Sequence, residues 1–121
     1  MNVLIILAHG SRREESNLEI ISLTKKVKKM AGTEYDLVEH AYLELIEPSL
    51  PQTIDNSINH GASKVTILPY FLNSGNHVKR DIPQIIKTAE GKYPDCIFKI
   101  CTCIGMIEDM PKLILEQARI R

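Results

Sequence analysis

The sequence predicts an α/β fold: a single doubly wound domain over residues 1–121, with a four-stranded parallel sheet in a flavodoxin-like order and helices on both faces. Short runs rich in valine, isoleucine and leucine alternate with longer stretches of helical periodicity. The first run is continuously apolar, as expected for a parallel strand that is covered on both faces. With 44% apolar residues in 121, the chain can build one core.

The expected strands are residues 2–8, 35–43, 64–71 and 96–101. The expected helices are residues 12–30, 48–61, 81–90 and 107–120. Ser11 and Glu14 have the spacing of a capping box at the first helix. Proline opens the second helix and Gly61 closes it, which is the usual asymmetry of helix ends. We expect Pro83 in the first turn of the third helix, with an earlier start left open.

Two histidines follow expected strands at the points where helices begin. His9 comes directly after the first strand, and His77 follows the third strand across residues 73–76. In the strand order 2-1-3-4 the first and third strands are neighbours, and ligands bind at the carboxyl ends of such strands. The topology therefore predicts that His9 and His77 meet in one crevice. Two converging imidazoles indicate metal or proton chemistry.

Two carboxylates follow the second strand, next to the first. Glu44 and Glu47 could each reach this crevice, and the alternative for each is a solvated loop acid, which we favour for Glu47. The remaining histidines are expected to be structural. His40 lies inside a strand, and His60 precedes Gly61 at a helix end, where a cation suits the helix dipole.

Charge and cysteine content narrow the classes of function. Lysine plus arginine equal aspartate plus glutamate at 15 each, which gives no nucleic-acid signature. No signal peptide or membrane span is expected. Cys96, Cys101 and Cys103 are too few and too clustered for a disulfide framework, so a cytoplasmic setting fits. Without a CxxC pair we expect buried or loop thiols rather than a zinc site.

Basic pairs follow both histidines, at residues 12–13 and 79–80. They would attract a polyanionic small molecule, and the alternative is that they are solvated residues of first helical turns. Neither a GxGxxG loop nor a Walker loop is present in the sequence.

Three segments together resemble the short form of the class II tetrapyrrole chelatases, the sirohydrochlorin cobaltochelatase family. They are LAHGSR (7–12), LELIEPSL (43–50) and LPYFL through HVKRDIP (68–83). Their order and separation fit nearly the whole chain, whereas residues 104–106 match loosely. The resemblance implies a lyase that inserts a divalent metal, most simply cobalt, into sirohydrochlorin without ATP, in cobalamin or tetrapyrrole (porphyrin) biosynthesis. Nickel or iron insertion, or a non-catalytic metal or tetrapyrrole carrier, are the alternatives.

The resemblance also implies roles for individual residues. His9 and His77 match the family's two active-site histidines and would hold the metal, and Glu44 matches their acidic partner. The metal, Co²⁺ or else Ni²⁺ or Fe²⁺, would be a substrate, with no retained cofactor. Residues expected to contact the tetrapyrrole are Ser11, Arg12, Glu44, Leu72, Asn73, Ser74, Gly75, Asn76, Lys79 and Arg80.

A homodimer is expected as well, with neither nucleic acid nor membrane as a partner. A domain of this length has a radius of gyration of about 13–14 Å. It can flank a macrocycle of similar breadth but hardly enclose it, and the resemblance includes longer relatives that fuse two such domains. Residues 70–72 and 106–107 are candidate contact surface, with ordinary core burial as the alternative.

Overall fold

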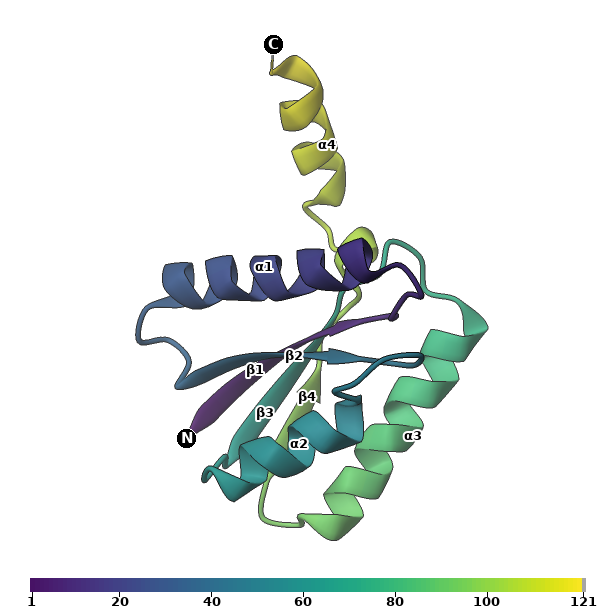
Figure 1. Ribbon diagram of the computed structural model, residues 1–121. Helices are drawn as coiled ribbons and strands as arrows, with labels where there is room; N and C mark the ends of the chain where they lie inside the picture. Colours follow the sequence, from purple (N-terminus) through teal and green to yellow (C-terminus); the bar gives the residue numbers. More distant parts are fainter. Residues whose placement is uncertain (121) are drawn as a thin grey trace.

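A computed structural model describes residues 1–120, except for the side chains of Asn76 and His77. The strands are β1 (Asn2–Ala8), β2 (Leu37–Tyr42), β3 (Lys64–Pro69) and β4 (Ile97–Ile100). The helices are α1 (Glu14–Ala31), α2 (Leu50–Asn59), α3 (Asn76–Lys92) and α4 (Met110–Arg119), with a short 3-10 helix, η1 (Ile104–Met106), before α4 (Figure 1).

The strands form one parallel sheet in the order β2-β1-β3-β4, which confirms the predicted fold class. The central strand β1 pairs with β2 through Leu7 and Ala41, and with β3 through Ile6 and Leu68. Helix α1 lies on one face of the sheet, and α2 and α3 lie on the other (Figure 1). Because β1 and β3 are neighbours, the segments that leave their carboxyl ends emerge side by side.

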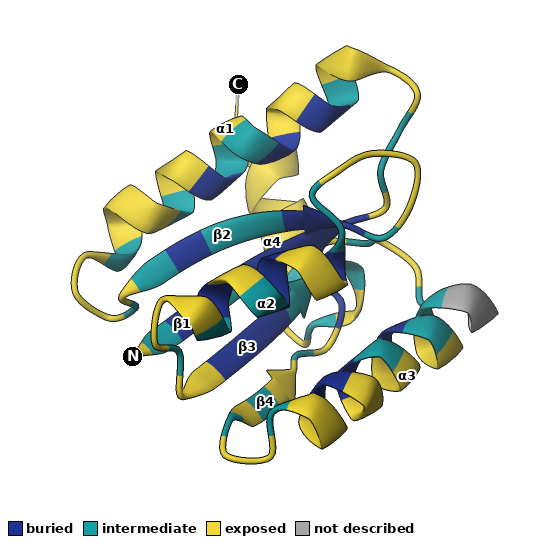
Figure 2. Cartoon of the chain, turned by 60° about the horizontal axis from the view of Figure 1, so that its bottom comes forward, coloured by how far each residue is buried: buried dark blue, intermediate teal, exposed yellow. Residues whose placement is uncertain are grey.

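The core is built on both faces of β1, as its continuous apolar run predicts. Val3, Ile5 and Leu7 are fully buried in the larger cluster under α2 and α3. On the opposite face Ala8 packs with Ile20 of α1 and Tyr42 of β2. The buried residues of Figure 2 follow these two layers. The carboxyl end of β1 is therefore packed on both faces up to Ala8, the residue that precedes His9.

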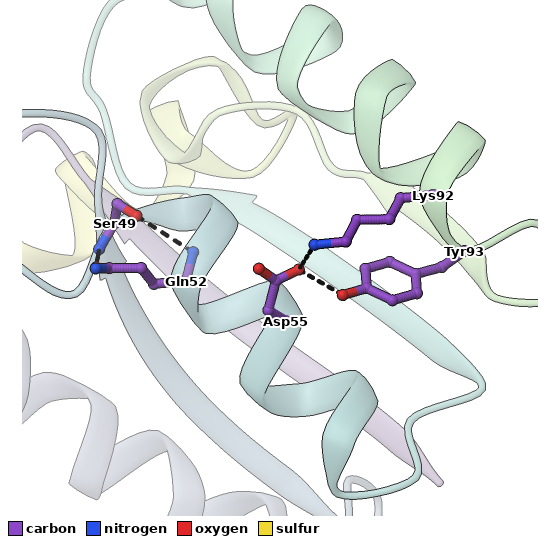
Figure 3. A network of polar contacts seen from close by, with 5 residues as sticks. All are labelled: Ser49, Gln52, Asp55, Lys92 and Tyr93. Carbon is purple, nitrogen blue, oxygen red and sulfur yellow. Dashed lines mark hydrogen bonds and ion pairs between the residues drawn. The ribbon is translucent and has the colours of Figure 1, made fainter.

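The start of α1 differs from the prediction. The N-cap is Arg13, and no side chain caps it by a hydrogen bond. Ser11 lies two residues too early to cap, and its Oγ accepts a hydrogen bond from the Arg13 N–H at 3.0 Å. By contrast, α2 begins at a true capping box. Ser49 accepts from the Gln52 N–H at 3.2 Å, and the Gln52 side chain accepts from the Ser49 N–H at 2.8 Å (Figure 3).

The placement of Pro83 in a first helical turn was wrong. Helix α3 already begins at Asn76, so Pro83 lies inside it. An interior proline removes one backbone hydrogen bond. The apolar face of the helix continues across it, with Val78 packed on the core and Ile82 and Ile86 almost fully buried. Burial of this face outweighs the single lost bond.

A polar contact ties the end of α3 to α2. The Tyr93 hydroxyl donates to Asp55 Oδ1 at 2.6 Å, and Lys92 Nζ donates to the same oxygen at 3.2 Å (Figure 3). These contacts, the Tyr93 hydrogen bond first, lower the pKa of Asp55 below its ordinary value of 3.8. The contact fixes the distal end of α3 on the body of the fold.

The last helix was predicted at residues 107–120, but α4 begins only at Met110. Ile107 is extended and leads the chain out of η1. Helix α4 then projects away from the sheet (Figure 1), and its substantial contacts within residues 1–120 are with η1. None of the helices in that range has the length and apolar content needed to cross a membrane.

Candidate functional site

His9 and Glu44 are brought together by backbone pairing that continues past the strand ends. The Leu43 N–H donates to the Ala8 carbonyl at 2.8 Å, and the Glu44 N–H donates to the His9 carbonyl at 3.1 Å. The side chains meet as well, with His9 Nε2 at 2.9 Å from Glu44 Oε1. Both are about half exposed, at 52% and 55%, so a ligand can reach them from solvent.

The chemistry of this pair assigns different roles to the two ring nitrogens of His9. Exposed pairs contribute little to stability, so folding alone does not explain the contact. An ionised carboxylate can only accept a hydrogen bond, so Nε2 is the nitrogen that carries the proton. In the neutral ring Nδ1 then holds a free lone pair, which can ligate a metal or accept a proton. A carboxylate that orients a histidine in this way also raises its strength as a ligand.

The ring of Phe71 also lies against the imidazole of His9. Its ring meets the His9 ring edge to face, with centroids 5.8 Å apart and an interplanar angle of 88°. The segment of Phe71 is held by η1, because the Gly105 N–H donates to the Phe71 carbonyl at 2.9 Å. Gly105 also lies directly against the backbone of Leu72, and a Cβ there would collide with it.

Asn17 of α1 holds the loop that follows His9 through two hydrogen bonds to Ser11, which we call the clasp. Its Oδ1 accepts from the Ser11 N–H at 3.0 Å, and its Nδ2 donates to the Ser11 carbonyl at 2.7 Å. Asn17 is 5% exposed, and its own carbonyl accepts from the Tyr42 hydroxyl at 2.7 Å. Burial raises the pKa of Tyr42, which keeps that hydroxyl protonated and able to donate. The loop is thus held by a series of hydrogen bonds that runs from Ser11 through Asn17 to Tyr42.

Gly10 completes the turn between His9 and this clasp. Its φ of +93° lies in the left-handed region that glycine adopts at little cost. A Cβ at this position would also collide with the Glu44 carbonyl. Glycine is therefore required both by the turn and by the close approach of the two loops.

His77 is the second residue of α3, and its side chain lies outside the described residues. That the side chains of His77 and His9 meet in one crevice thus stays a prediction. The residues around this part of α3 are described. Glu44, Asp81 and Gln84 line a hollow of about 270 Å³ between the end of β2 and α3. The backbone of His77 lies one helical turn before Asp81.

The other residues that were predicted to contact the tetrapyrrole lie in the loops after β1 and β3 and in the first turns of α3. A second hollow of about 330 Å³ is lined by Ser74, Lys79 and Met106, among others. Leu72 is 71% exposed. The remaining predicted contacts that are exposed are Arg12, Asn73, Gly75 and Arg80. Asn76 has its side chain outside the described residues.

Glu47, His40 and His60 are not brought to the His9 pair. Glu47 accepts a hydrogen bond from Gln52 Nε2 at 3.2 Å, and with His40 it lines a different hollow of about 500 Å³. Burial lowers the pKa of His40, whose ring packs edge to face on Tyr42. His60 is the C-cap of α2, with Nδ1 at 2.8 Å from the Asn56 carbonyl.

The cysteines are free, and Cys103 is buried. Cys101 and Cys103 line the 330 Å³ hollow. Burial raises the pKa of Cys96.

Among the described side chains, which leave out His77, no three or more histidine, cysteine, aspartate or glutamate residues gather closely enough to hold a metal ion.

Sequence reasoning missed Asn17 and Phe71 as neighbours of the site. Asn17 carried a usable signal, because it lies in helical phase with Ile20 and Thr24 on the buried side of α1. A polar side chain on such a face needs a partner. Phe71 lies in residues 68–72, a segment that carries the family resemblance, but nothing in the sequence indicated that its ring would lie against His9.

The family model described as CbiX matches residues 3–120 of the chain. A sirohydrochlorin cobaltochelatase of Methanococcus maripaludis is 43% identical over 91 residues, which cover 75% of this chain and 62% of the relative. A chloroplastic sirohydrochlorin ferrochelatase of Arabidopsis thaliana is 36% identical over 102 residues, 84% of this chain and 44% of the relative. The chain thus spans less than two thirds of the length of these relatives.

Solved structures have the same fold. A CbiX protein of Marinobacter aquaeolei, described as a cobalamin biosynthesis protein, has a TM-score of 0.81 at 25% identity, covering 97% of this chain and 93% of the other. The sirohydrochlorin chelatase SirB of Bacillus subtilis, in complex with cobalt, has a TM-score of 0.83 at 25% identity. That match covers 97% of this chain but 49% of SirB.

Proposed function

The chain belongs to the CbiX family, and from this premise we propose that it is an enzyme, a sirohydrochlorin chelatase that inserts a divalent metal without ATP. The observation that carries the proposal is the 2.9 Å approach of Glu44 Oε1 to His9 Nε2 at the carboxyl end of β1. This pair leaves a histidine lone pair accessible where an open α/β sheet binds its ligands.

The reaction sets the requirements for the site. When M²⁺ enters the free-base macrocycle, the two pyrrolic N–H groups lose their protons and the four nitrogens ligate the metal. We assign metal delivery to His9 and His77, and to Glu44 the orientation of His9. Nδ1 of His9 ligates the incoming ion. Once the ion has passed to the macrocycle, the same lone pair accepts one of the two released protons, and solvent takes the other.

A site that transfers a metal has to bind it weakly enough to release it. Two imidazoles and one orienting carboxylate form a smaller ligand set than the four ligands of closed structural zinc sites. We therefore treat the metal as a substrate, with no cofactor retained. The half-exposed pair supports this view, because the metal and then the macrocycle can reach it from solvent.

The macrocycle and its carboxylates occupy the rim of the site in this proposal. The hollow beside Lys79 and Ser74 takes an edge of the ring, and basic side chains attract its acidic substituents. The residues assigned to this rim are Ser11, Arg12, Glu44, Leu72, Asn73, Ser74, Gly75, Asn76, Lys79 and Arg80.

Cobalt is the proposed metal, because the relative with 43% identity is named a cobaltochelatase. Iron is the second candidate, because another relative is named a ferrochelatase. We further propose that residues 1–121 form one chelatase-like domain that works in the cytoplasm as a homodimer. The exposed side chains of Tyr70, Leu72 and Met106 support a contact with a second copy at the rim.

The test is an insertion assay with sirohydrochlorin and Co²⁺, Ni²⁺ or Fe²⁺ offered singly and in competition, followed by absorbance. We expect many equivalents of product per chain, with Co²⁺ preferred. A carrier would stop at one equivalent. No acceleration over the rate without protein, for any of the three metals, would reject the chelatase proposal.

A further inference from the structure

Leu45 has a backbone conformation that leucine rarely adopts. Its φ is +72°, and within the part of the chain that the structure describes it is the only residue other than glycine with a positive φ. The Ile46 N–H donates to the Glu44 carbonyl at 2.9 Å, across this single residue. A hydrogen bond of this span with a positive φ at its centre forms the rare and strained kind of γ-turn. Leucine therefore occupies a position that favours glycine.

The loop around Leu45 is held at several points, so its surroundings maintain the strained turn. The loop joins β2 to α2 (Figure 1). At its two ends, the Tyr42 N–H donates to the Pro48 carbonyl at 2.9 Å, and Tyr42 is 1% exposed. The Glu44 N–H donates to the His9 carbonyl at 3.1 Å. A costly conformation that is maintained by such contacts is typical of functional sites.

The side chain of Leu45 contributes little to the core. It is 61% exposed, and it belongs to neither cluster of core residues. At the other positive-φ positions, Gly10, Gly32 and Gly61, the chain has glycine, which adopts this conformation at little cost. Folding alone would favour glycine at position 45 as well. An exposed apolar side chain in a strained turn therefore indicates a contact with something outside the folded chain.

The position of Leu45 indicates what it contacts. Leu45 follows Glu44 directly, and Glu44 Oε1 lies 2.9 Å from His9 Nε2. In the proposed reaction the ion passes from His9 into the ring nitrogens, so one face of the macrocycle has to lie over His9. Side chains beside His9 then lie against that face. The face of a conjugated ring is apolar and its carboxylates are at the edge, so burial against a leucine side chain is favourable.

An exposed apolar residue flanks His9 on the other side as well. The Tyr70 N–H donates to the Leu7 carbonyl at 2.7 Å, so the continuation of β3 runs along the side of β1 opposite to Leu45. In that continuation Leu72 is 71% exposed. Adjacent strands lie about 4.8 Å apart, so the two flanks are separated by about 10 Å at the strand ends. A tetrapyrrole ring is broad enough to contact both.

We propose that Leu45 is a contact residue for the tetrapyrrole, whose side chain packs against the face of the macrocycle that receives the metal. The inference rests on the chelatase proposed above and adds a residue that positions its substrate. The strained turn holds the side chain beside His9 before the macrocycle arrives, so little conformational freedom is lost on binding. Leu45 therefore acts on the binding of the macrocycle and not on the binding of free metal.

The test separates the side chain of Leu45 from its backbone strain. Leu45→Ala removes the side chain and keeps the strain, whereas Leu45→Gly removes both. Leu45→Met keeps an apolar side chain of similar volume. Met30→Gln is the control for loss of an exposed apolar side chain, because Met30 is 88% exposed in the last turn of α1, away from His9. Binding of metal-free sirohydrochlorin is titrated by absorbance, and KM and kcat of insertion are measured with Co²⁺.

We expect Leu45→Ala and Leu45→Gly to raise the dissociation constant and the KM for sirohydrochlorin by about 10-fold, as when roughly half of a leucine side chain loses its burial. The kcat and the KM for Co²⁺ should change by less than about threefold, because the lost contact is made before and during the reaction alike. Leu45→Met should recover most of the affinity, and Met30→Gln should match the natural chain. In denaturant, Leu45→Gly should unfold at a midpoint no lower than that of Leu45→Ala, because glycine tolerates the turn.

Normal binding by Leu45→Ala, or equally weakened binding by Met30→Gln, would overturn the proposal. Normal binding of sirohydrochlorin together with lost self-association of Leu45→Ala, measured by light scattering, would assign the side chain to a second copy instead. A natural chain that binds sirohydrochlorin but gives no product overturns the chelatase proposal alone, because the dissociation constants still test Leu45. A natural chain that binds no sirohydrochlorin overturns both.

Discussion

Nε2 of His9 lies 2.9 Å from Oε1 of Glu44, at the point where β1 and the continuation of β2 run side by side. The two residues are 35 positions apart in the sequence, and adjacent parallel strands bring them together. Neither side chain is buried, so the pair adds little to folding. Its value is chemical, because the carboxylate selects which ring nitrogen keeps a free lone pair.

Glu44→Gln tests the orienting role directly. The amide can accept at the same place but lacks the charge, so we expect metal insertion to slow by about 10–100-fold, the usual cost of losing an outer-shell partner. Initial rates with sirohydrochlorin and Co²⁺ measure this. Glu47→Gln is the matched control, since Glu47 pairs with Gln52 and not with His9. Equal rates for the two variants would remove Glu44 from the site.

Asn17→Asp tests whether the clasp on Ser11 positions His9. Aspartate keeps an oxygen for the Ser11 N–H but replaces the Nδ2 donor with an acceptor that faces the Ser11 carbonyl. We expect a loss of about 1–3 kcal/mol in the free energy of unfolding. We also expect a fall in the insertion rate constant that persists when the protein is fully folded, at temperatures well below the unfolding transition. Normal turnover by the folded variant would show the clasp to be structural only.

Asp55→Asn tests the contact between α2 and α3 through its pH dependence. The pKa of Asp55 is lowered in the folded protein, so folding favours the ionised carboxylate. The stabilisation is therefore complete above the unfolded value of 3.8 and is lost as the pH falls through the lower folded value. At neutral pH we expect Asp55→Asn to cost at most about 1 kcal/mol, because the contact is exposed and screened.

The measurement is denaturant unfolding of both chains from pH 7 to pH 3. The difference between the natural chain and Asp55→Asn should begin to shrink below about pH 4, where Asp55 takes up a proton in the unfolded chain before it does so in the folded protein. Asp95→Asn, an exposed position beyond the same helix, makes the same chemical change as a control. A difference that stays constant down to pH 3 would contradict the assignment.

The strands and their order could be predicted from the sequence because apolar runs and crossover rules determine them. The approach of Glu44 to His9 followed from that order, since both residues leave adjacent parallel strands. The clasp of Asn17 on Ser11 could not be predicted, because it depends on the path of a loop and on one rotamer. The prediction that Pro83 lies in a first helical turn was wrong, because a proline in the first turn and one inside a well-packed helix look alike in sequence.

The path of α4 could not be predicted for a different reason. Its apolar spacing indicates an amphipathic helix, but no local signal states which surface its apolar side packs against. Helix propensity and periodicity are properties of one segment, whereas the direction in which residues 107–109 leave η1 is a property of the tertiary structure. Sequence reasoning therefore ends at the amphipathic helix itself.

The most direct test of the central claim, that Glu44 acts through His9 in metal insertion, is a double-mutant cycle on the insertion rate. It compares His9→Ala, Glu44→Gln and the double variant with the natural chain, using sirohydrochlorin and Co²⁺ at saturating concentrations. Residues that act as one unit are strongly non-additive. The account predicts that the double variant is no slower than His9→Ala alone. Independent losses that multiply in the double variant, or a His9→Ala variant as fast as the natural chain, would contradict it.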